Sequence, residues 1–409
     1  MKIIIQKFGG TSVSTKDKRE MVVSKVKKAI SDGYFPVLVV SAMGRRGESY
    51  ATDTLLSLVS DNFKENNKQG TDLLMSCGEI ISTVVMSDCL FEHGIDAVPL
   101  TGGQAGILTD NNYSKADFLD VTPKKVLEIL NKGKVPVVAG FQGRDIEGYF
   151  TTLGRGGSDT SAAALGVALK ACEVDIYTDV DGIMTADPRI VSTAELIDKI
   201  SYNEVFQLAD HGAKVIHPRA VEVAMRGNVP LVIKNTMSSS EGTVIDSIGD
   251  TEDTRFLTGV THTSGRIQIS IKLKDNLNNE KYKSILEILA QNKISLDLIN
   301  IFPKEKVFTI SEEVRDTFRK IMKENKLKYT YIDELSTIAV VGSKMKGIPG
   351  VMAKIISTLD KYNIEVLQTA DSHMTIWCLV ETKNVRDAIN ALHKVFIEKW
   401  NKRQIFRIN

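Results

Sequence analysis

The sequence predicts an α/β protein in which a three-layer domain with a mostly parallel sheet is followed by two small ferredoxin-like α+β modules. Residues 1 to about 245 alternate short apolar runs with amphipathic helical stretches, the signature of such a domain. A polar stretch at 237–254 ends this pattern, and two successive β-α-β-β-α patterns follow it. The 409 residues are also too many for one ordinary core. We expect domains at 1–245, 257–330 and 331–409.

The strands expected in the first domain are short, rich in β-branched residues and apolar on both faces, as covered parallel strands are. They span 3–5, 36–40, 135–139, 174–177 and 229–233. Helical periodicity marks 17–31, 52–62, 71–92, 122–132, 158–170 and 217–227. Ligands of such sheets bind at the carboxyl ends of the strands, and the glycine-rich turns of this chain follow expected strands.

Each C-terminal module is expected to run strand, helix, strand, strand, helix. The first comprises 267–273, 281–291, 296–302, 307–310 and 314–323. The second comprises 337–341, 351–362, 365–369, 375–380 and 385–396. The sequence leaves open whether a further strand at 257–262 belongs to the first or the second module.

Composition excludes several classes of protein. Basic and acidic side chains number 52 and 51, so the net charge of +1 gives no reason to expect nucleic-acid binding. An anionic substrate would have to meet locally placed cations. The first residues lack the apolar run of a signal peptide, and no run approaches about 18 apolar residues, so we expect a cytoplasmic protein without a membrane span. The four cysteines are scattered, which fits small buried side chains in a reducing compartment.

The strongest local motif is Lys7-Phe8-Gly9-Gly10-Thr11-Ser12, directly after the first expected strand and before a helix. Glycines let the backbone approach a phosphate closely, and a helix N-terminus offers free N–H groups. Lys7 supplies a point charge for phosphate oxygens. The motif is neither a Walker loop nor GxGxxG, and a plain tight turn with an exposed lysine would also explain it.

A second glycine-rich turn, 153–161, reads LGRGGSDTS and again enters a helix. An arginine among three glycines suits bidentate recognition of a carboxylate or phosphate. Ser158, Asp159 and Thr160 equally fit helix capping.

Four weaker signals accompany these two. Thr178-Asp179-Val180-Asp181-Gly182 follows an expected strand, where carboxylates can meet Mg²⁺ or a ribose and where turn chemistry alone also favours Asp and Gly. The remaining three are the stretch GAKVIHP at 212–218, Ser41 after the strand PVLVV, and the segment SCGE, whose Glu79 would ordinarily complement a helix dipole from the first turn.

Together these motifs resemble the aspartate kinases of the amino-acid kinase superfamily. KFGGTS, VVSAMG, SCGE, GFQG, LGRGGSDTSAA, TDVDG with TADPR, and GAKVIHP follow the order of that family, and the resemblance covers essentially the whole chain. The C-terminal modules look like the paired ACT repeats of the monofunctional bacterial form, with MKGIPGVMAKI and LQTADSHMTIW as the best-matching segments. The resemblance implies an amino-acid kinase fold for the first domain.

The resemblance also implies roles for individual residues. The implied ATP-binding residues are Lys7, Gly9, Gly10, Ser41, Thr178, Asp179, Met184, Arg189 and Lys214. The implied aspartate-binding residues are Thr52, Glu79, Phe141, Arg155 and Ser158, with Arg155 on the α-carboxylate and Glu79 on the α-ammonium. Lys7, Asp159 and Lys214 would be catalytic, with Mg²⁺ carried by ATP near Asp159 and held by no direct side-chain ligand. Family members often carry an aromatic residue where Met184 stands.

The chemistry of aspartate phosphorylation suits the residues that the resemblance implies. The side chain of aspartate has a pKa of about 3.9, so it is already an anionic nucleophile at neutral pH and needs no general base. Phosphoryl transfer then depends on positioning and charge stabilisation. The product, 4-phospho-L-aspartate, would start the lysine, threonine and methionine (diaminopimelate) pathway.

Regulation is expected from the ACT repeats, through an amino-acid effector such as lysine, threonine or diaminopimelate and through a homodimer or a dimer of dimers. The expected effector residues are Lys344, Gly347, Ile348, Pro349, Gly350, Val351, Gln368, Thr369, Asp371, Ser372 and His373. Two alternatives stay open: another enzyme of the amino-acid kinase fold, and a non-catalytic amino-acid sensor.

Overall fold

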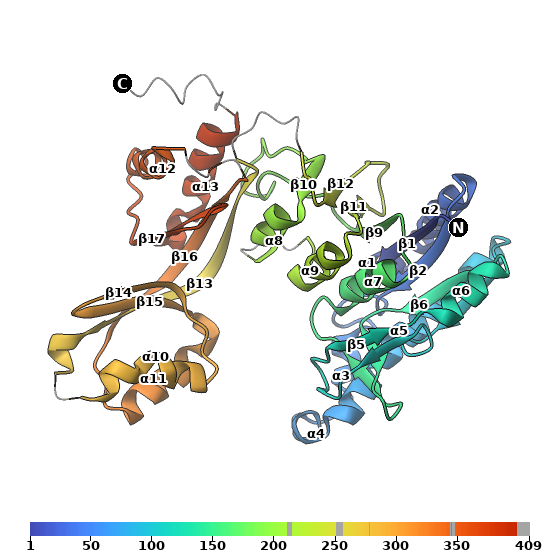
Figure 1. The fold of residues 1–409 in the computed structure, drawn as a ribbon, viewed down its shortest axis with the longest axis horizontal. Coiled ribbons are helices and arrows are strands. Elements are labelled where there is room, and N and C mark those ends of the chain that lie inside the picture. The colour runs from blue at the N-terminus through green and yellow to red at the C-terminus, as the bar shows by residue number, and fades with distance from the viewer. Residues whose placement is uncertain (211–214, 251–256, 278, 344, 346–347, 399–409) are drawn as a thin grey trace. The chain divides into compact units, whose positions relative to one another are not determined.

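The computed structural model describes residues 1–210, 215–250, 257–277, 279–343, 345 and 348–398. The described residues form two compact units (Figure 1). The first unit contains 1–183, 196–210 and 215–250, and the second contains 184–195 and 257–398. The three-domain division at 245, 257 and 331 stays a prediction, since residues 184–195 join the second unit although they precede the expected boundary.

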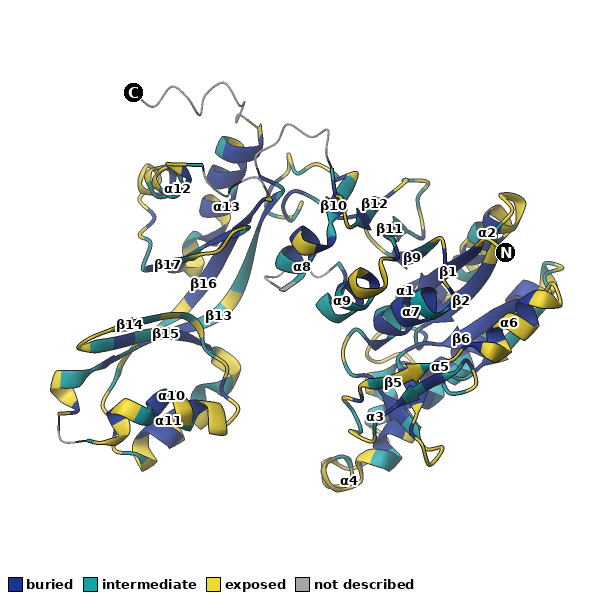
Figure 2. Cartoon of the chain, viewed as in Figure 1, coloured by how far each residue is buried: buried dark blue, intermediate teal, exposed yellow. Residues whose placement is uncertain are grey.

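The first unit is built on an eight-stranded sheet of order β10-β12-β11-β9-β1-β2-β6-β3. Its strands are β1 (Ile3–Phe8), β2 (Phe35–Val40), β3 (Ala97–Leu100), β6 (Val135–Ala139), β9 (Glu173–Thr178), β10 (Lys199–Ser201), β11 (Leu231–Asn235) and β12 (Thr243–Asp246). Every neighbouring pair is parallel except β11 with β12. The central strands β1, β2 and β9 are buried along most of their length (Figure 2), as their β-branched runs predict.

Helices cover both faces of this sheet and confirm the expected three layers. The helices are α1 (Gly10–Val13), α2 (Lys16–Ser31), α3 (Thr52–Leu56), α4 (Asp61–Asn66), α5 (Lys68–Glu92), α6 (Lys124–Asn131), α7 (Gly157–Ala168), α8 (Tyr202–Asp210) and α9 (Pro218–Gly227). Phe8 and Leu38 pack with side chains of α2 and α5 on one face. Helix α7 lies on the other face, where a β-carbon at Gly166 would collide with Val174.

The first unit differs from the expected pattern in several places, since β3, β10, β12 and α8 were not expected. The helix expected at 52–62 is two helices, because the Ser60 hydroxyl accepts the Phe63 N–H and starts α4 anew. A second, four-stranded sheet was not expected at all, since its strands have only three or four residues. Its order is β5-β4-β7-β8, with β4 (Ile107–Thr109), β5 (Phe118–Val121), β7 (Gln142–Arg144) and β8 (Phe150–Thr152).

Helix α5 is long and apolar enough to cross a membrane by length and composition alone. One side of it is instead buried in the first unit, with Met86 and Leu90 in the core against the sheet, while Leu73, Val84 and Phe91 are exposed. It also buries two carboxylates, Asp72 and Glu79. The apolar residues of α5 are therefore accounted for in large part by packing against the sheet.

The second unit is built on a six-stranded sheet of order β14-β15-β13-β16-β18-β17. Its strands are β13 (Gly259–Lys272), β14 (Asp297–Phe302), β15 (Glu305–Ser311), β16 (Thr330–Val341), β17 (Gln368–Asp371) and β18 (Thr375–Glu381). Its longer helices are α10 (Lys281–Gln291), α11 (Arg315–Glu324), α12 (Val351–Asp360) and α13 (Val385–His393), with short turns η1 (Leu273–Asp275), η2 (Glu312–Val314), η3 (Thr382–Asn384) and η4 (Lys394–Glu398). The strand expected at 365–369 is displaced to Gln368–Asp371.

Strand β13 contributes to two hydrophobic cores, one with α10 and α11 and the other with α12 and α13, and β16 contributes to the second of these. Residues Arg266–Lys272 pair with β15, whereas Gly259–Thr263 pair with Thr337–Val341 of β16. Leu257 and Val260 lie in the core that contains α12 and α13. The strand left open at 257–262 therefore belongs to the second module.

Residues 184–195 also pack in that second core. Ala186 and Val191 are buried among its side chains, and Thr185 Oγ1 lies 2.9 Å from Nε2 of His393, which is itself buried at the end of α13. A segment that the strand pattern placed in the first domain is thus part of the regulatory core.

Candidate active site

The loop after β1 lies directly against the loop after β2. The Gly44 N–H donates to the Gly10 carbonyl at 3.1 Å, and the Ser41 N–H donates to the Phe8 carbonyl at 3.1 Å. A β-carbon at position 10 would overlap the Ala42 carbonyl oxygen, so this close approach requires glycine. Helix α1 has only four residues, so its dipole adds little, and a phosphate here would depend on N–H groups and Lys7.

Lys7 and Asp159 form an ion pair in the middle of this edge of the sheet. The Lys7 ammonium lies 2.6 Å from the Asp159 carboxylate, and the two side chains are 11% and 14% exposed. Lys7 is the next-to-last residue of β1, and Asp159 lies in the first turn of α7. A cation this enclosed keeps much of its electrostatic effect, because water screens it weakly.

Glu79 is a buried carboxylate beside the same loops. One oxygen accepts the Ala42 N–H at 3.1 Å, while the other has no hydrogen-bond partner within the described part of the chain. Desolvation raises the pKa of Glu79 to about 8. Because Glu79 lies in the middle of α5, the expectation that it complements a helix dipole from the first turn is wrong. A buried oxygen without a donor is a site for an ammonium.

Three more of the residues implied for substrate gather where β6 and β8 meet α7. The Phe141 ring packs so closely on Gly157 that a β-carbon added there would lie 2.8 Å from the ring. The Ser158 hydroxyl packs on Gly140 equally closely, since a β-carbon added there would lie 3.0 Å from its oxygen. Phe141 has a φ of 68°, a strained value for an aromatic residue, of the kind found where structure is held for function. Arg155 is exposed on the adjacent loop, and within the described residues its guanidinium is in no ion pair.

A cavity of about 330 Å³ opens beside the loop after β1 and helix α1. Its lining residues are Thr11, Ser12, Ser14, Lys18, Gly44, Arg45, Glu48, Thr178, Asp179 and Met237. Thr178 and Asp179 were expected to bind the nucleotide, while Lys18, Arg45 and Met237 were missed, since nothing in their local sequence marks them. Arg45 pairs with Asp179 at 2.9 Å, so the carboxylate is already matched to a cation.

The structure does not place every expected nucleotide residue at this cavity. Lys214 lies outside the described residues. Met184 and Arg189 belong to the second unit, where Arg189 pairs with Asp187 on its own loop at 2.7 Å. Thr52, expected at the substrate, is the first residue of α3, which packs against α5.

A second cavity, of about 280 Å³, lies in the module with α12 and α13. It is lined by Met345, Ile348, Gly350, Val351, Met352, Asp371, Ser372, His373 and Ile376. Six of the expected effector residues are in this set. Lys344 and Gly347 lie outside the described residues, and the Gln368 amide turns away to bond the Asn300 side chain at 2.5 Å. Pro349 and Thr369 do not line the cavity.

Comparisons with known proteins agree with this architecture. A model of the amino acid kinase family matches residues 2–235, and an ACT domain model matches 330–394. Aspartokinase 1 of Bacillus subtilis is 43% identical over 401 residues, which cover 97% of this chain and 99% of that protein. The chain belongs to the aspartokinase family. Among solved aspartokinases, E. coli aspartokinase III in complex with aspartate and ADP, described as the R-state, is 25% identical with a TM-score of 0.76, covering 96% of this chain and 99% of that one.

The same aspartokinase has been solved in complex with lysine and aspartate, described as the T-state. That structure is 25% identical to this chain with a TM-score of 0.75, and the match covers 97% of this chain and 100% of that one. Membership of the aspartokinases accounts for the succession of a kinase domain and ACT modules in a single chain. It assigns no individual side chain, so the expected site residues stay predictions supported by their placement.

Proposed function

We propose that this aspartokinase transfers the γ-phosphoryl group of ATP to the side-chain carboxylate of L-aspartate. The proposal rests on Glu79, which has one buried oxygen without a hydrogen-bond donor. Its other oxygen accepts the Ala42 N–H, which holds the side chain beside the loop after β1. An amino-acid substrate would bring the ammonium that this oxygen lacks. Arg155 on the adjacent loop suits the α-carboxylate, which leaves the β-carboxylate to meet the nucleotide.

The reaction requires two anions to approach. A carboxylate oxygen of aspartate attacks the γ-phosphorus, and the bond from that phosphorus to the β–γ bridging oxygen breaks to release ADP. Lys7 reduces the repulsion between these groups and stabilises the charge on the transferring phosphoryl group. In this account Asp159 holds the Lys7 ammonium in place until phosphate oxygens share it.

The residues around Lys7 fit a magnesium ion that is carried by the nucleotide. No cluster of three metal-ligating side chains exists among the described residues, and the carboxylate nearest Lys7 is Asp159. Mg²⁺ bound with ATP would neutralise phosphate charge. We propose that the cavity of about 330 Å³ holds nucleotide through Thr178 and Asp179. Lys214, Met184 and Arg189 stay nucleotide-binding predictions that rest on the family resemblance alone.

Regulation follows from the second unit. E. coli aspartokinase III binds lysine in its T-state, which supports an amino-acid effector for this relative as well. We place that effector in the cavity between Ile348–Val351 and Asp371–His373, with lysine, threonine or diaminopimelate as candidates. The protein would act in the cytoplasm as a homodimer or a dimer of dimers through its ACT modules.

A hydroxylamine-trapping assay tests the reaction against its alternatives. Purified protein with Mg²⁺ and ATP is offered L-aspartate, L-glutamate, N-acetyl-L-glutamate or a nucleoside monophosphate. The proposal predicts a hydroxamate and matching ADP release with L-aspartate, and at most traces of either with the others. ADP release is the readout for the nucleoside monophosphate, because its phosphorylated product forms no hydroxamate. Preference for another acceptor would indicate a different enzyme of this fold, and no turnover with any acceptor would indicate a sensor.

A further inference from the structure

The loop that carries Arg155 is short and contains one turn, closed by the Gly157 N–H, which donates to the Gly154 carbonyl at 3.0 Å. It connects β8 to α7 through 153–156, and both Gly154 and Gly156 adopt left-handed conformations, with φ of 74° and 71°. Glycines at such positions are free to move through a wide range of φ and ψ. The place of the Arg155 guanidinium therefore depends on contacts that the rest of the molecule makes with this loop, among them the Leu153 N–H, which donates to the Phe141 carbonyl at 2.9 Å.

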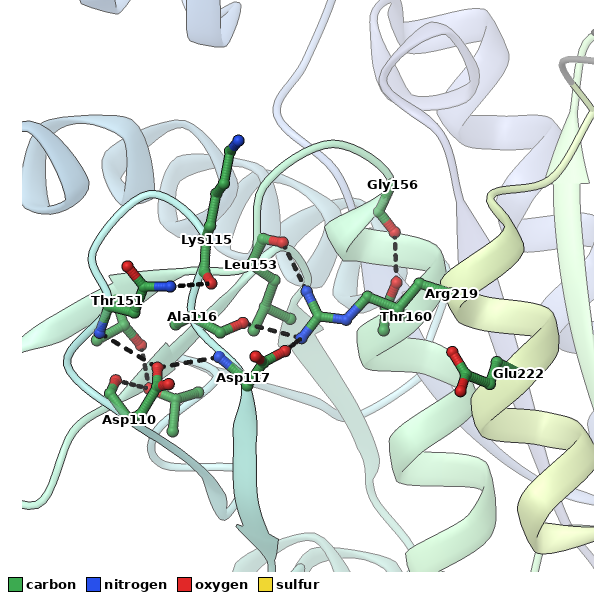
Figure 3. A network of polar contacts seen from close by, with 12 residues as sticks. Asp110, Lys115, Ala116, Asp117, Thr151, Leu153, Gly156, Thr160, Arg219 and Glu222 are labelled. Carbon is green, nitrogen blue, oxygen red and sulfur yellow. Dashed lines mark hydrogen bonds and ion pairs between the residues drawn. The ribbon is translucent and has the colours of Figure 1, made fainter. Parts of the chain in front are cut away.

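Arg219 of α9 makes the most direct of these contacts (Figure 3). Its guanidinium donates to the Leu153 carbonyl at 2.9 Å, to the Ala116 carbonyl at 2.9 Å and to the Asp117 carboxylate at 2.7 Å. It also lies 5.5 Å from the Phe118 ring centre. One planar side chain thus ties the Arg155 loop to the neighbouring loop 110–117, a task for which the fixed fork of an arginine is suited.

Asp72 of α5 joins loop 110–117 to the end of β8 from the buried side. Its carboxylate accepts the N–H and hydroxyl of Ser114 at 2.9 and 3.1 Å, and the N–H and hydroxyl of Thr152 at 2.7 and 3.0 Å. The Ala116 N–H further donates to the Thr152 carbonyl at 2.9 Å. Loop 110–117 is therefore a fixed support, and Arg219 extends this support to Leu153, two residues before Arg155.

We propose that Arg219 is a positioning residue for aspartate: it holds the Arg155 loop at the geometry in which Arg155 receives the substrate carboxylate. The inference rests on the proposed function, because it assumes that Arg155 contacts aspartate. Arg219 itself touches no substrate in this account.

Several observations separate this role from a general contribution to stability. The Arg219 and Asp117 side chains are 25% and 73% exposed, and ion pairs this open to water contribute little to folding. His217, at the start of the same helix, contacts Gly156 independently of Arg219. Loss of Arg219 should therefore release the loop locally and leave α9 in place.

The experiment compares Arg219→Ala, Arg155→Ala and the double variant by steady-state kinetics on the full chain. Arg226→Ala is the matched control, since Arg226 lies on the same helix and pairs with Glu222 away from the loop. We expect Arg219→Ala to raise KM for aspartate about tenfold or more, while KM for ATP stays within about twofold, as a shift of a positioning group does. In the Arg155→Ala background, removal of Arg219 should raise KM for aspartate no further.

The outcomes distinguish the inference from the proposed function. If Arg155→Ala leaves KM for aspartate unchanged, the substrate role of Arg155 is wrong, and the role of Arg219 is wrong with it. If Arg155→Ala raises KM but Arg219→Ala does not, or if their effects multiply in the double variant, only the positioning role is refuted. Should Arg219→Ala fail to fold, Arg219→Lys takes its place, because lysine keeps the charge but lacks the planar fork whose two nitrogens reach the two carbonyls. A wild-type KM for aspartate in that variant contradicts the inference.

Discussion

Glu79→Gln is the substitution that most sharply tests the substrate pocket. The change keeps the size and shape of the side chain and removes its charge. In the structure Glu79 is 3% exposed, with one oxygen bonded to the Ala42 N–H and the other without a partner. Burial raises its pKa from 4.5 to about 8, so in the free enzyme the group is mostly protonated at neutral pH.

The shift has a defined sign for stability. Because the folded pKa lies above the unfolded value, the folded protein retains a proton between pH 4.5 and about 8, and stability falls as the pH rises through that window. At about 1.4 kcal/mol per pH unit, ionised Glu79 costs about 5 kcal/mol above pH 8. Urea unfolding should therefore find Glu79→Gln more stable than wild type at pH 9 and little changed at pH 5.

The raised pKa of Glu79 should also make the binding of aspartate depend on pH. An α-ammonium selects the carboxylate form of Glu79, so KM for aspartate in the wild type should fall roughly eightfold between pH 7 and 8.5. Glu79→Gln should raise KM for aspartate, flatten this pH dependence and leave KM for ATP nearly unchanged. Glu92→Gln, on the exposed end of the same helix, is the control. A wild-type KM and pH profile in Glu79→Gln would refute the reasoning.

Three further changes probe other parts of the molecule. Lys7→Ala should lower kcat by about a hundredfold or more with an unchanged circular dichroism spectrum, and near-normal turnover would contradict its role. Lys234→Met should cost about 3–5 kcal/mol in urea unfolding at pH 8, because the buried Asp175, 2.7 Å from the Lys234 ammonium, would lose its cation. That loss should shrink as the pH falls, because burial raises the pKa of Asp175, removal of Lys234 raises it further, and the protonated carboxyl no longer needs a cation. A pH-independent loss would argue for a packing effect instead. Asp371→Ala should raise the effector concentration for half-inhibition at least about tenfold, measured with lysine, threonine and diaminopimelate in turn, and unchanged inhibition would place the effector elsewhere.

The core of the fold was predictable from the sequence because buried parallel strands are short apolar runs. β1, β2, β6, β9 and β11 all lie within a few residues of their expected positions. The small sheet and the short strands β3, β10 and β12 were missed, since strands of three or four residues carry no readable period. The sequence also could not show that β13 passes through both regulatory cores, because that depends on pairing with strands far along the chain.

The candidate site was predictable where its residues follow strands. Lys7, Glu79 and Arg155 belong to recognisable motifs. These motifs are far apart in the sequence and lie near one another at one edge of the sheet. Asp72 and Arg219 carry no such local signal, since they act on carbonyl and N–H groups 42 to 103 residues away. Residues that only hold other residues in place are therefore recognised from the three-dimensional structure.

The central claim is that this protein lets two anions meet at Lys7 and makes an acyl phosphate of aspartate. Borohydride treatment of the reaction mixture tests this most directly, because reduction of β-aspartyl phosphate yields homoserine, which mass spectrometry identifies. With Mg²⁺, ATP and L-aspartate we predict homoserine in proportion to the ADP formed, and none with Lys7→Ala. ADP formation without homoserine, or no ADP at all under saturating substrates, would contradict the account.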